Sequence, residues 1–266
     1  MNPEMNNWLQ LILRWAHVVA GVIWIGHLYF FNFVNAHFAK LLDGPTKKSV
    51  VPELMPRALY WFRWGAAWTW ITGILLGGLI YYHGKQAFDS DYQSQNPWLW
   101  LGAVLVILAL GFVLYNLIMK SVKNVVVASI IAMALFAAAY FVLEFAGHFG
   151  GRSLYIHAGL MFGTIMAMNV WMVIWPAQQK IIRAVKEGTA PDANLVALAG
   201  LRSRQNTYMS VPLIFFMISN HFAPVYSNTE LLLGIPVRDW CAAGIIALGF
   251  AATRMLFAKS AKVTGF

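Results

Sequence analysis

Three histidines lie in residues 15–37, a stretch that is otherwise apolar enough to cross a bilayer. His17, His27 and His37 recur every ten residues, close to three helical turns, so their rings are expected along one side of one helix. An ionisable side chain inside a membrane is costly unless a partner satisfies it, so it indicates a functional site by default. The simpler alternative is a hydrogen bond from each ring to a carbonyl group or to a neighbouring helix.

Histidine is the common axial ligand of haem that is bound without covalent attachment. Gly21 lies near one helical turn from His17, and Gly159 and Gly163 follow His157 in a G-x-x-x-G pattern. Small residues let another helix, or a flat cofactor, approach the backbone closely. We therefore expect haem b in the outer half of the membrane, with His17 as its first axial ligand and His157 as the partner. Tight helix packing is the commoner meaning of G-x-x-x-G and stays open as an alternative.

Four further residues are candidates for the cofactor site. His221 and His148 are expected at a depth similar to that of His17, so they are the other candidate iron ligands. Arg63 lies among tryptophans and is expected to pair with a haem propionate or with a phospholipid head group. The tryptophans themselves are typical of an interfacial aromatic belt. Asn169 is a candidate cofactor contact, with a hydrogen bond across helices as the alternative.

Two other polar features lie in apolar segments. Glu144 is the one carboxylate well inside such a segment, and we expect it to pair with Arg152 or to reach outward to the surface, with acceptance of a proton as the alternative. Residues 203–221 carry several polar side chains on either side of Pro212. Proline frees a backbone carbonyl within a helix, and nearby polar groups can compensate for it. A purely structural kink is the alternative for this segment.

The composition places the chain among integral membrane proteins. Hydrophobic residues make up 60% of the chain and charged residues 11%, and the mean hydropathy is +0.62. A soluble domain typically carries about 25% charged residues. Cys241 is the only cysteine, which excludes an internal disulfide, a cysteine-based metal cluster and covalent haem attachment through C-x-x-C-H. The sequence contains no Gly-rich phosphate loop and no dinucleotide fingerprint.

The apolar pattern predicts an all-α integral membrane protein, a bundle of about seven transmembrane helices forming a single domain over residues 1–266. The first apolar run is too long for a signal peptide and is interpreted as a retained helix. Two longer connections, 37–57 and 177–206, interrupt the series, and Gly188 and Pro191 are expected to end an amphipathic helix in the second. The predicted spans are approximately 8–36, 58–83, 97–119, 123–147, 153–176, 207–226 and 239–258.

The distribution of Lys and Arg predicts the orientation. Of the nineteen, fourteen fall on alternate connections and on the C-terminal tail, whereas the opposite side has three. Basic residues favour the cytoplasmic side, so we expect a periplasmic N-terminus and a cytoplasmic C-terminus in a bacterial inner (cytoplasmic) membrane. The net charge of +9 is then a topology signal, and no nucleic acid partner is needed to explain it. The fourteen are Lys40, Lys47, Lys48, Arg57, Lys120, Lys123, Lys180, Arg183, Lys186, Arg202, Arg204, Arg254, Lys259 and Lys262.

Four segments of the chain resemble the membrane part of the bacterial PuuD-type urate oxidase family. They are RWAHVVAGVIWIG, WFRWGAAWTWITG, IHAGLMFGTIMAMNVWMVIWPAQ and SRQNTYMSVPLIFFMISNHF, in the first, second, fifth and sixth predicted spans. The resemblance implies a multi-span protein that oxidises urate to 5-hydroxyisourate and passes electrons to a cytochrome c fused at the C-terminus. This chain has no C-x-x-C-H, so a cytochrome c is expected to be a separate chain docking outside. Gly65 and Gln205 also depart from the family, since an acidic residue and a histidine are expected there.

Two functional hypotheses follow. The first is a haem-b membrane oxidoreductase of the urate-oxidase type, served by a separate cytochrome c. The second is a non-catalytic subunit that anchors a larger, multi-subunit respiratory complex or carries its electrons, with a redox subunit as partner. A transporter is a third hypothesis because Pro212 and the polar residues inside the spans suit one, although no paired charges mark an ion path. Membrane lipids surround the protein in every case.

Overall fold

The computed structural model describes residues 2–264, and the chain in this range is almost entirely helical. Within residues 2–264 the only strands form a two-stranded antiparallel hairpin, β1–β2, in which Leu231 pairs with Pro236. The all-α class predicted from the apolar pattern is therefore confirmed. The elements, with π- and 3-10 helices marked η, are α1 Pro3–Tyr29, η1 Phe30–Asn35, α2 Ala36–Leu41, α3 Gly44–Gly77, η2 Gly78–His83, η3 Ser90–Tyr92, α4 Pro97–Ser121, α5 Val125–Phe141, η4 Val142–Ala146, α6 Gly151–Asn169, η5 Val170–Ile174, α7 Trp175–Glu187, α8 Ala193–Ile218, η6 Ser219–His221, α9 Ala223–Ser227, β1 Leu231–Leu232, β2 Ile235–Pro236 and α10 Val237–Ser260.

Within the described residues, five helical segments are both long and apolar enough to cross a membrane. Seven were predicted, and the two that fall outside this set are 58–83 and 207–226. The first falls in α3 and η2, and α3 begins with more polar sequence at Gly44. The second begins inside α8, which starts at Ala193 and ends at Ile218, and non-helical Phe222 separates η6 from α9 within it. The chain is therefore a multi-pass membrane protein, with five segments that meet both criteria. The five are Pro3–Leu41, Pro97–Ser121, Val125–Ala146, Gly151–Glu187 and Val237–Ser260.

The two predicted connections are mostly helical. In the first, α3 begins at Gly44 and contains Pro52 and Pro56 within its length. Asp43 precedes this helix and accepts the Thr46 backbone N–H at 2.8 Å. Hydrogen bonding to the Thr46 side chain, and then to this backbone N–H, lowers the pKa of the Asp43 carboxyl. In the second, α7 continues directly from η5 and ends at Gly188, whose φ of 77° is the left-handed conformation that glycine adopts without strain. The prediction that Gly188 ends this helix is confirmed.

The chain divides into two compact units, each of which is described by itself. Unit 1 contains residues up to Leu13, Gly73–Ile165 and Pro212–Ile246, and unit 2 contains Arg14–Thr72, Met166–Val211 and residues from Ala247 onward. Five helices continue from one unit into the other along the chain: α1, α3, α6, α8 and α10.

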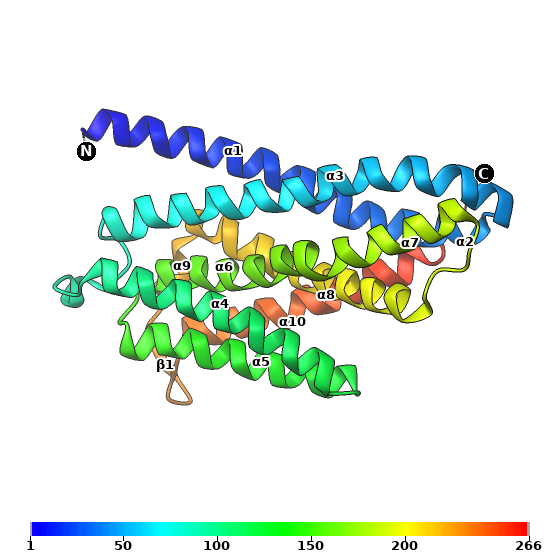
Figure 1. Ribbon diagram of the computed structural model, residues 1–266. Helices are drawn as coiled ribbons and strands as arrows, with labels where there is room; N and C mark the ends of the chain where they lie inside the picture. Colours follow the sequence, from blue (N-terminus) through cyan, green and yellow to red (C-terminus); the bar gives the residue numbers. More distant parts are fainter. Residues whose placement is uncertain (1, 265–266) are drawn as a thin grey trace. The chain divides into compact units, whose positions relative to one another are not determined.

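In unit 1, α4 and α5 form an antiparallel hairpin with a very short turn (Figure 1). Both helices start at an asparagine cap: Asn96 accepts backbone N–H groups at the start of α4, and Asn124 does so at the start of α5. Near the ends of these helices, Gly150 donates its N–H to Ala87 O and Asp89 donates its N–H to His148 O. Burial raises the pKa of the Asp89 carboxyl in this loop.

In unit 2, α1 and α3 cross closely. The side of α1 that is buried repeats at helical spacing and includes Ala20, Trp24 and Leu28. A Cβ atom at Gly65 of α3 would lie 3.0 Å from the backbone nitrogen of Trp24 and 3.2 Å from the carbonyl oxygen of Ala20. Only glycine permits this approach, so Gly65 sets the distance between the two helices.

Candidate functional site

His17 lies on α1 in unit 2, and its ring hydrogen-bonds to the Thr72 side chain and to the backbone of Thr69, both on α3. Its Nδ1 is 3.1 Å from the hydroxyl oxygen of Thr72 on α3. The single hydroxyl proton of Thr72 is directed to backbone carbonyl oxygens, at 2.6 Å from Trp68 O and 3.1 Å from Thr69 O. Thr72 therefore accepts from His17, whose Nδ1 carries the proton. The Nε2 of a neutral His17 then bears the lone pair, which is the arrangement that iron ligation requires.

An aromatic groove lies beside this histidine in the same unit. It has a volume of about 530 Å³ and runs between α1 and α3. Thr72, the hydrogen-bond acceptor of His17, forms part of its wall, and so does Gly65. Most of the remaining wall is aromatic or aliphatic and comes from Trp15, Ala16, Val19, Ala20, Ile23, Tyr60, Trp61, Trp64 and Trp68. The groove is therefore an apolar surface next to the group that orients His17.

His157 lies on α6 in unit 1 and is only 2% exposed. Its Nδ1 is 2.7 Å from the carbonyl oxygen of Ser153, which can only accept, so Nδ1 carries the proton. The Nε2 lone pair accepts the hydroxyl proton of Tyr82 at 2.8 Å. The rings of Tyr81, Tyr82 and Phe149 meet the imidazole edge-on, with centroids 5.7, 5.8 and 5.0 Å away. Both nitrogens of His157 are thus engaged, and aromatic rings enclose it.

The glycines that suggested room for a porphyrin pack against helices. A Cβ atom at Gly159 would lie 2.5 Å from Met217 Cε and 3.1 Å from Phe216 Cβ, both on α8. One at Gly163 would lie 3.5 Å from Leu213 on the same helix. Tight helix packing, the commoner meaning of G-x-x-x-G, therefore accounts for this pair.

The other candidate histidines have different surroundings. His148 has a φ of 53° and stacks on Tyr92, with ring centroids 3.7 Å apart and planes 6° from parallel. His221 is exposed in the short helix η6. His27 is 2.7 Å from the carbonyl oxygen of Ile23, which is the simple hydrogen bond considered for it from sequence.

Arg63 is held by aromatic rings of unit 2. Its guanidinium carbon lies 4.0 Å from the ring centre of Trp175 and 5.7 Å from that of Trp171. Trp171 also donates its indole N–H to the carbonyl oxygen of Arg63 at 3.0 Å. The Arg63 Nε is buried and makes no hydrogen bond within the described residues. Its expected partner, a propionate or a lipid phosphate, stays a prediction.

Asn169 belongs to a buried network of neutral polar groups in unit 2. Its amide donates to the side-chain oxygen of Asn206 at 2.9 Å, and Asn206 donates to Met166 O at 2.9 Å. Asn32 donates to the Ser203 hydroxyl at 2.8 Å. The hydrogen bond across helices, stated as the alternative for Asn169, is therefore present, and the polar segment after residue 203 contributes to it.

Glu144 has a different partner from the one predicted. It accepts a hydrogen bond from Arg238 at 2.7 Å and is only 6% exposed, so it neither pairs with Arg152 nor reaches outward. Arg152 instead donates to Asn220 at 2.8 Å and to Gln86 at 3.3 Å. The sequence interpretation missed Arg238 and also Tyr82. Two signals were available in the sequence. Arg238 and Asp239 form a charged pair at the start of the last predicted span, and Tyr81 and Tyr82 directly precede His83.

These contacts decide how the predicted residues fit haem. His17 fits, because a second residue holds its Nδ1–H and its Nε2 keeps the lone pair. His157 does not fit in this conformation, because Tyr82 occupies its Nε2. His17 belongs to unit 2 and His157 to unit 1. No group of three or more His, Cys, Asp or Glu side chains that could hold a metal ion occurs among residues 2–264.

Long apolar helices that enclose a buried histidine, a buried ion pair and buried amide groups define a multi-pass membrane protein with polar groups inside its helices. The family model described as "Urate oxidase N-terminal" matches residues 3–49 and 41–263. The chain therefore belongs to this urate-oxidase-type membrane family, as its four segments predicted. Searches of curated proteins and of solved structures give no significant match.

Proposed function

We propose that the chain is a haem-b membrane oxidoreductase of the urate-oxidase type in the bacterial inner membrane. It converts urate to 5-hydroxyisourate and passes the electrons to a separate cytochrome c on the outer side. The observation that carries this proposal is the family match, which extends from residue 3 to residue 263. The orientation that we propose with it has seven spans, a periplasmic N-terminus and a cytoplasmic C-terminus, and it rests on the basic residues of alternate connections.

The reaction balances with water as the source of oxygen. Urate and one water give 5-hydroxyisourate, two protons and two electrons, and two molecules of oxidised cytochrome c each accept one electron. Haem, when bound, supplies the one-electron redox chemistry that links these partners.

Among the chain's own residues, we propose that His17 binds the iron through Nε2. Thr72 holds the Nδ1–H and thereby fixes both the tautomer and the ring orientation. Ligation by His157 requires that the hydrogen bond from Tyr82 be broken first. His148 and His221 are the further candidates for a second residue that would hold the haem iron.

For the substrate, we propose the polar group around Arg152 in unit 1. Urate is a planar anion at neutral pH, and a guanidinium with neighbouring amides suits such a molecule because of its charge and its parallel donors. Arg152 already contacts the side chains of Asn220 and Gln86, and Tyr81 donates to the same Asn220 oxygen at 3.2 Å. These contacts hold the guanidinium in one orientation.

The test is urate-dependent reduction of added cytochrome c by the purified protein in nanodiscs. We expect reduction in proportion to urate consumed, and a pyridine haemochrome assay should give about one or two protohaems per chain. The variant Arg152→Gln should raise KM for urate, and Lys85→Gln serves as a control that removes another charge from the same side. Haem without urate turnover would favour the alternative, an electron-carrying or anchoring subunit. A folded, colourless protein would contradict the haem proposal.

A further inference from the structure

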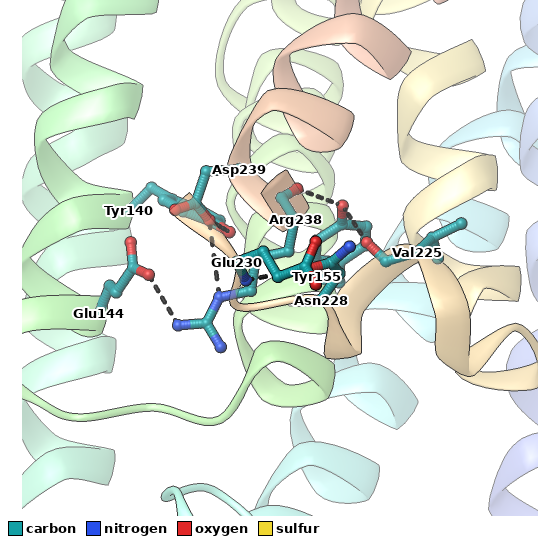
Figure 2. Close-up of polar contacts among 8 residues, drawn as sticks. All are labelled: Tyr140, Glu144, Tyr155, Val225, Asn228, Glu230, Arg238 and Asp239. Carbon is teal, nitrogen blue, oxygen red and sulfur yellow. Dashed lines mark hydrogen bonds and ion pairs between the residues drawn. The ribbon is translucent and has the colours of Figure 1, made fainter. Parts of the chain in front are cut away.

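A buried group of charges lies in unit 1, and its one contact with a candidate histidine is through the backbone, where the His148 N–H donates to the Glu144 carbonyl oxygen at 3.1 Å. Arg238 Nη2 donates to Glu144 Oε1 at 2.7 Å, and its Nε lies 3.8 Å from Asp239 Oδ1 (Figure 2). Glu144 is 6% exposed, and Arg238 and Asp239 are each 7% exposed. Glu144 comes from η4 at the end of one candidate span, and the other two come from the first turn of α10, which starts another.

The charges in this group do not balance. Glu144 and Asp239 are two carboxylates, and Arg238 is the one cation that both share. The other groups that act on them are Tyr140 of α5 and Tyr155 of α6, which are neutral when protonated, and Asp89, which would add negative charge. Cys241 acts on Tyr155, and His148 acts on Asp89. An uncompensated charge is costly in a buried site. One bound proton would make the buried trio neutral.

Two carboxylate oxygens of the trio are free to hold that proton. Glu144 Oε2 and Asp239 Oδ2 are buried, and neither makes a hydrogen bond within the described part of the chain. These side chains are more than nine-tenths buried and converge on the same guanidinium (Figure 2). Protonation adds a hydrogen to one of these oxygens and leaves the Arg238 contacts in place.

The surroundings favour Glu144 as the protonated partner. Asp239 accepts the Tyr140 hydroxyl at 2.8 Å and lies in the first turn of α10, where the helix dipole stabilises a negative charge. Glu144 lies in the last turn of its helix, where the dipole opposes a negative charge. We propose that Glu144, Asp239 and Arg238 form a proton-binding site that holds one proton on Glu144 Oε2 at neutral pH, with Asp239 ionised.

The backbone of Arg238 also holds a neighbouring segment. Arg238 donates its backbone N–H to Asn228 O at 3.1 Å, and its carbonyl oxygen accepts the Tyr155 hydroxyl at 2.6 Å (Figure 2). The same hydroxyl donates to Val225 O at 2.8 Å. These hydrogen bonds therefore hold residues 225–238 in place around Arg238, the cation that Glu144 and Asp239 share. Proton binding at these residues requires no urate chemistry, so its test is independent of the test of the proposed function.

Infrared spectroscopy of the whole protein in nanodiscs at neutral pH tests the proposal. We expect one carbonyl band of a buried protonated carboxyl group, which shifts on labelling with ¹³C-glutamate and not with ¹³C-aspartate. Glu144→Gln keeps the oxygen that accepts from Arg238 and should abolish the band. Asp239→Asn should abolish it too, because Glu144 then becomes the only counter-ion of Arg238. Glu53→Gln, at the exposed Arg57–Glu53 pair, should leave it unchanged.

Three results would overturn the proposal. They are a wild-type protein without the band, a band that survives Glu144→Gln, and a band that shifts with labelled aspartate. Size-exclusion profiles of the variants exclude loss of folding as the cause of a missing band. Since Glu144 and Asp239 are the two buried carboxylates among the described residues, the band has few other assignments.

Discussion

His17 in unit 2 and His157 in unit 1 carry their proton on the same nitrogen, yet they differ in what meets the other one. The carbonyl oxygen of Ser153, one turn earlier in the same helix, fixes the tautomer of His157, and the Thr72 hydroxyl on another helix fixes that of His17. Tyr82 then occupies Nε2 of His157, whereas the Nε2 of His17 keeps its lone pair. The units differ in their buried polar groups too, since unit 1 contains an ion pair and unit 2 a network of amides and hydroxyls. A histidine in a span can therefore bind a metal without rearrangement only when its second nitrogen is unoccupied.

The largest expected effect on stability is in the charged group of unit 1. Arg238→Ala leaves Glu144 and Asp239 buried without their cation and should lower the free energy of unfolding by roughly 3–5 kcal/mol. Thermal unfolding in nanodiscs measures the change. Arg57→Ala is the matched control, because the Arg57–Glu53 pair is exposed and is worth only about 0.3–0.5 kcal/mol. Equal losses in both variants would remove the distinction between the buried and the exposed pair.

The neutral network of unit 2 should respond less. Asn206→Ala removes the acceptor that Asn169 uses and a donor to Met166 O, at an expected cost of about 1–3 kcal/mol. Ser129→Ala removes one exposed hydrogen bond to Val125 O and should change the unfolding temperature little. A cost for Asn206→Ala as large as that for Arg238→Ala would contradict the comparison of the two units.

The close contact between α1 and α3 at Gly65 should tolerate an added methyl group poorly. Gly65→Ala places a Cβ 3.0 Å from a backbone atom of Trp24, which cannot move alone, and should cost about 1–3 kcal/mol. Gly159→Ala should cost less, because the nearest atom is the flexible end of Met217. Gly26→Ala meets nothing within 4 Å and serves as the control in thermal unfolding. If Gly159→Ala is the more damaging, the tighter crossing is not at Gly65.

The smallest expected changes in stability come from the hydrogen-bond partners of the two histidines, and haem binding by the same variants compares the two histidines directly. Thr72→Val and Tyr82→Phe each remove one hydrogen bond to a ring and should cost about 0.5–1.5 kcal/mol. Haem titration should distinguish them. Thr72→Val should weaken binding about 10- to 100-fold, because it removes the partner of a ligating histidine. Tyr82→Phe should not weaken it. If Tyr82→Phe weakened haem binding and Thr72→Val did not, His157 would be the principal ligand.

The sequence predicted the helical class, the helix end at Gly188 and the family, because apolar runs, turn residues and local motifs are written in consecutive residues. It also marked Asn169 and the polar segment after residue 203, which do bond across helices. Pairings between distant segments could not be predicted in the same way. Tyr82 and His157 are 75 residues apart, and Glu144 and Arg238 are 94 apart. Their contact depends on how helices pack.

Gly65 illustrates the same limit. From sequence it was a departure from the acidic residue that the family resemblance leads one to expect. In the structure it is the position where α3 meets the backbone of α1, and a carboxylate there would need a different helix crossing. The number of spans shows the same limit. The apolar segments of α3 and α8 continue from more polar helix, whereas a sequence pattern assigns that polar part to a connection.

The central claim is that His17 is an axial ligand of haem b, and the visible spectrum of His17→Ala tests it most directly. Wild type, His17→Ala and His37→Ala are purified in nanodiscs, and the Soret band and extractable haem are measured per chain. His37, whose Nε2 is 3.3 Å from the Ser260 hydroxyl, is the matched control on the same stretch of helix. We expect His17→Ala to lose the Soret band while His37→Ala keeps it. Full haem content and an unchanged spectrum in His17→Ala would contradict the account, and the ligands would then be sought among His148, His157 and His221.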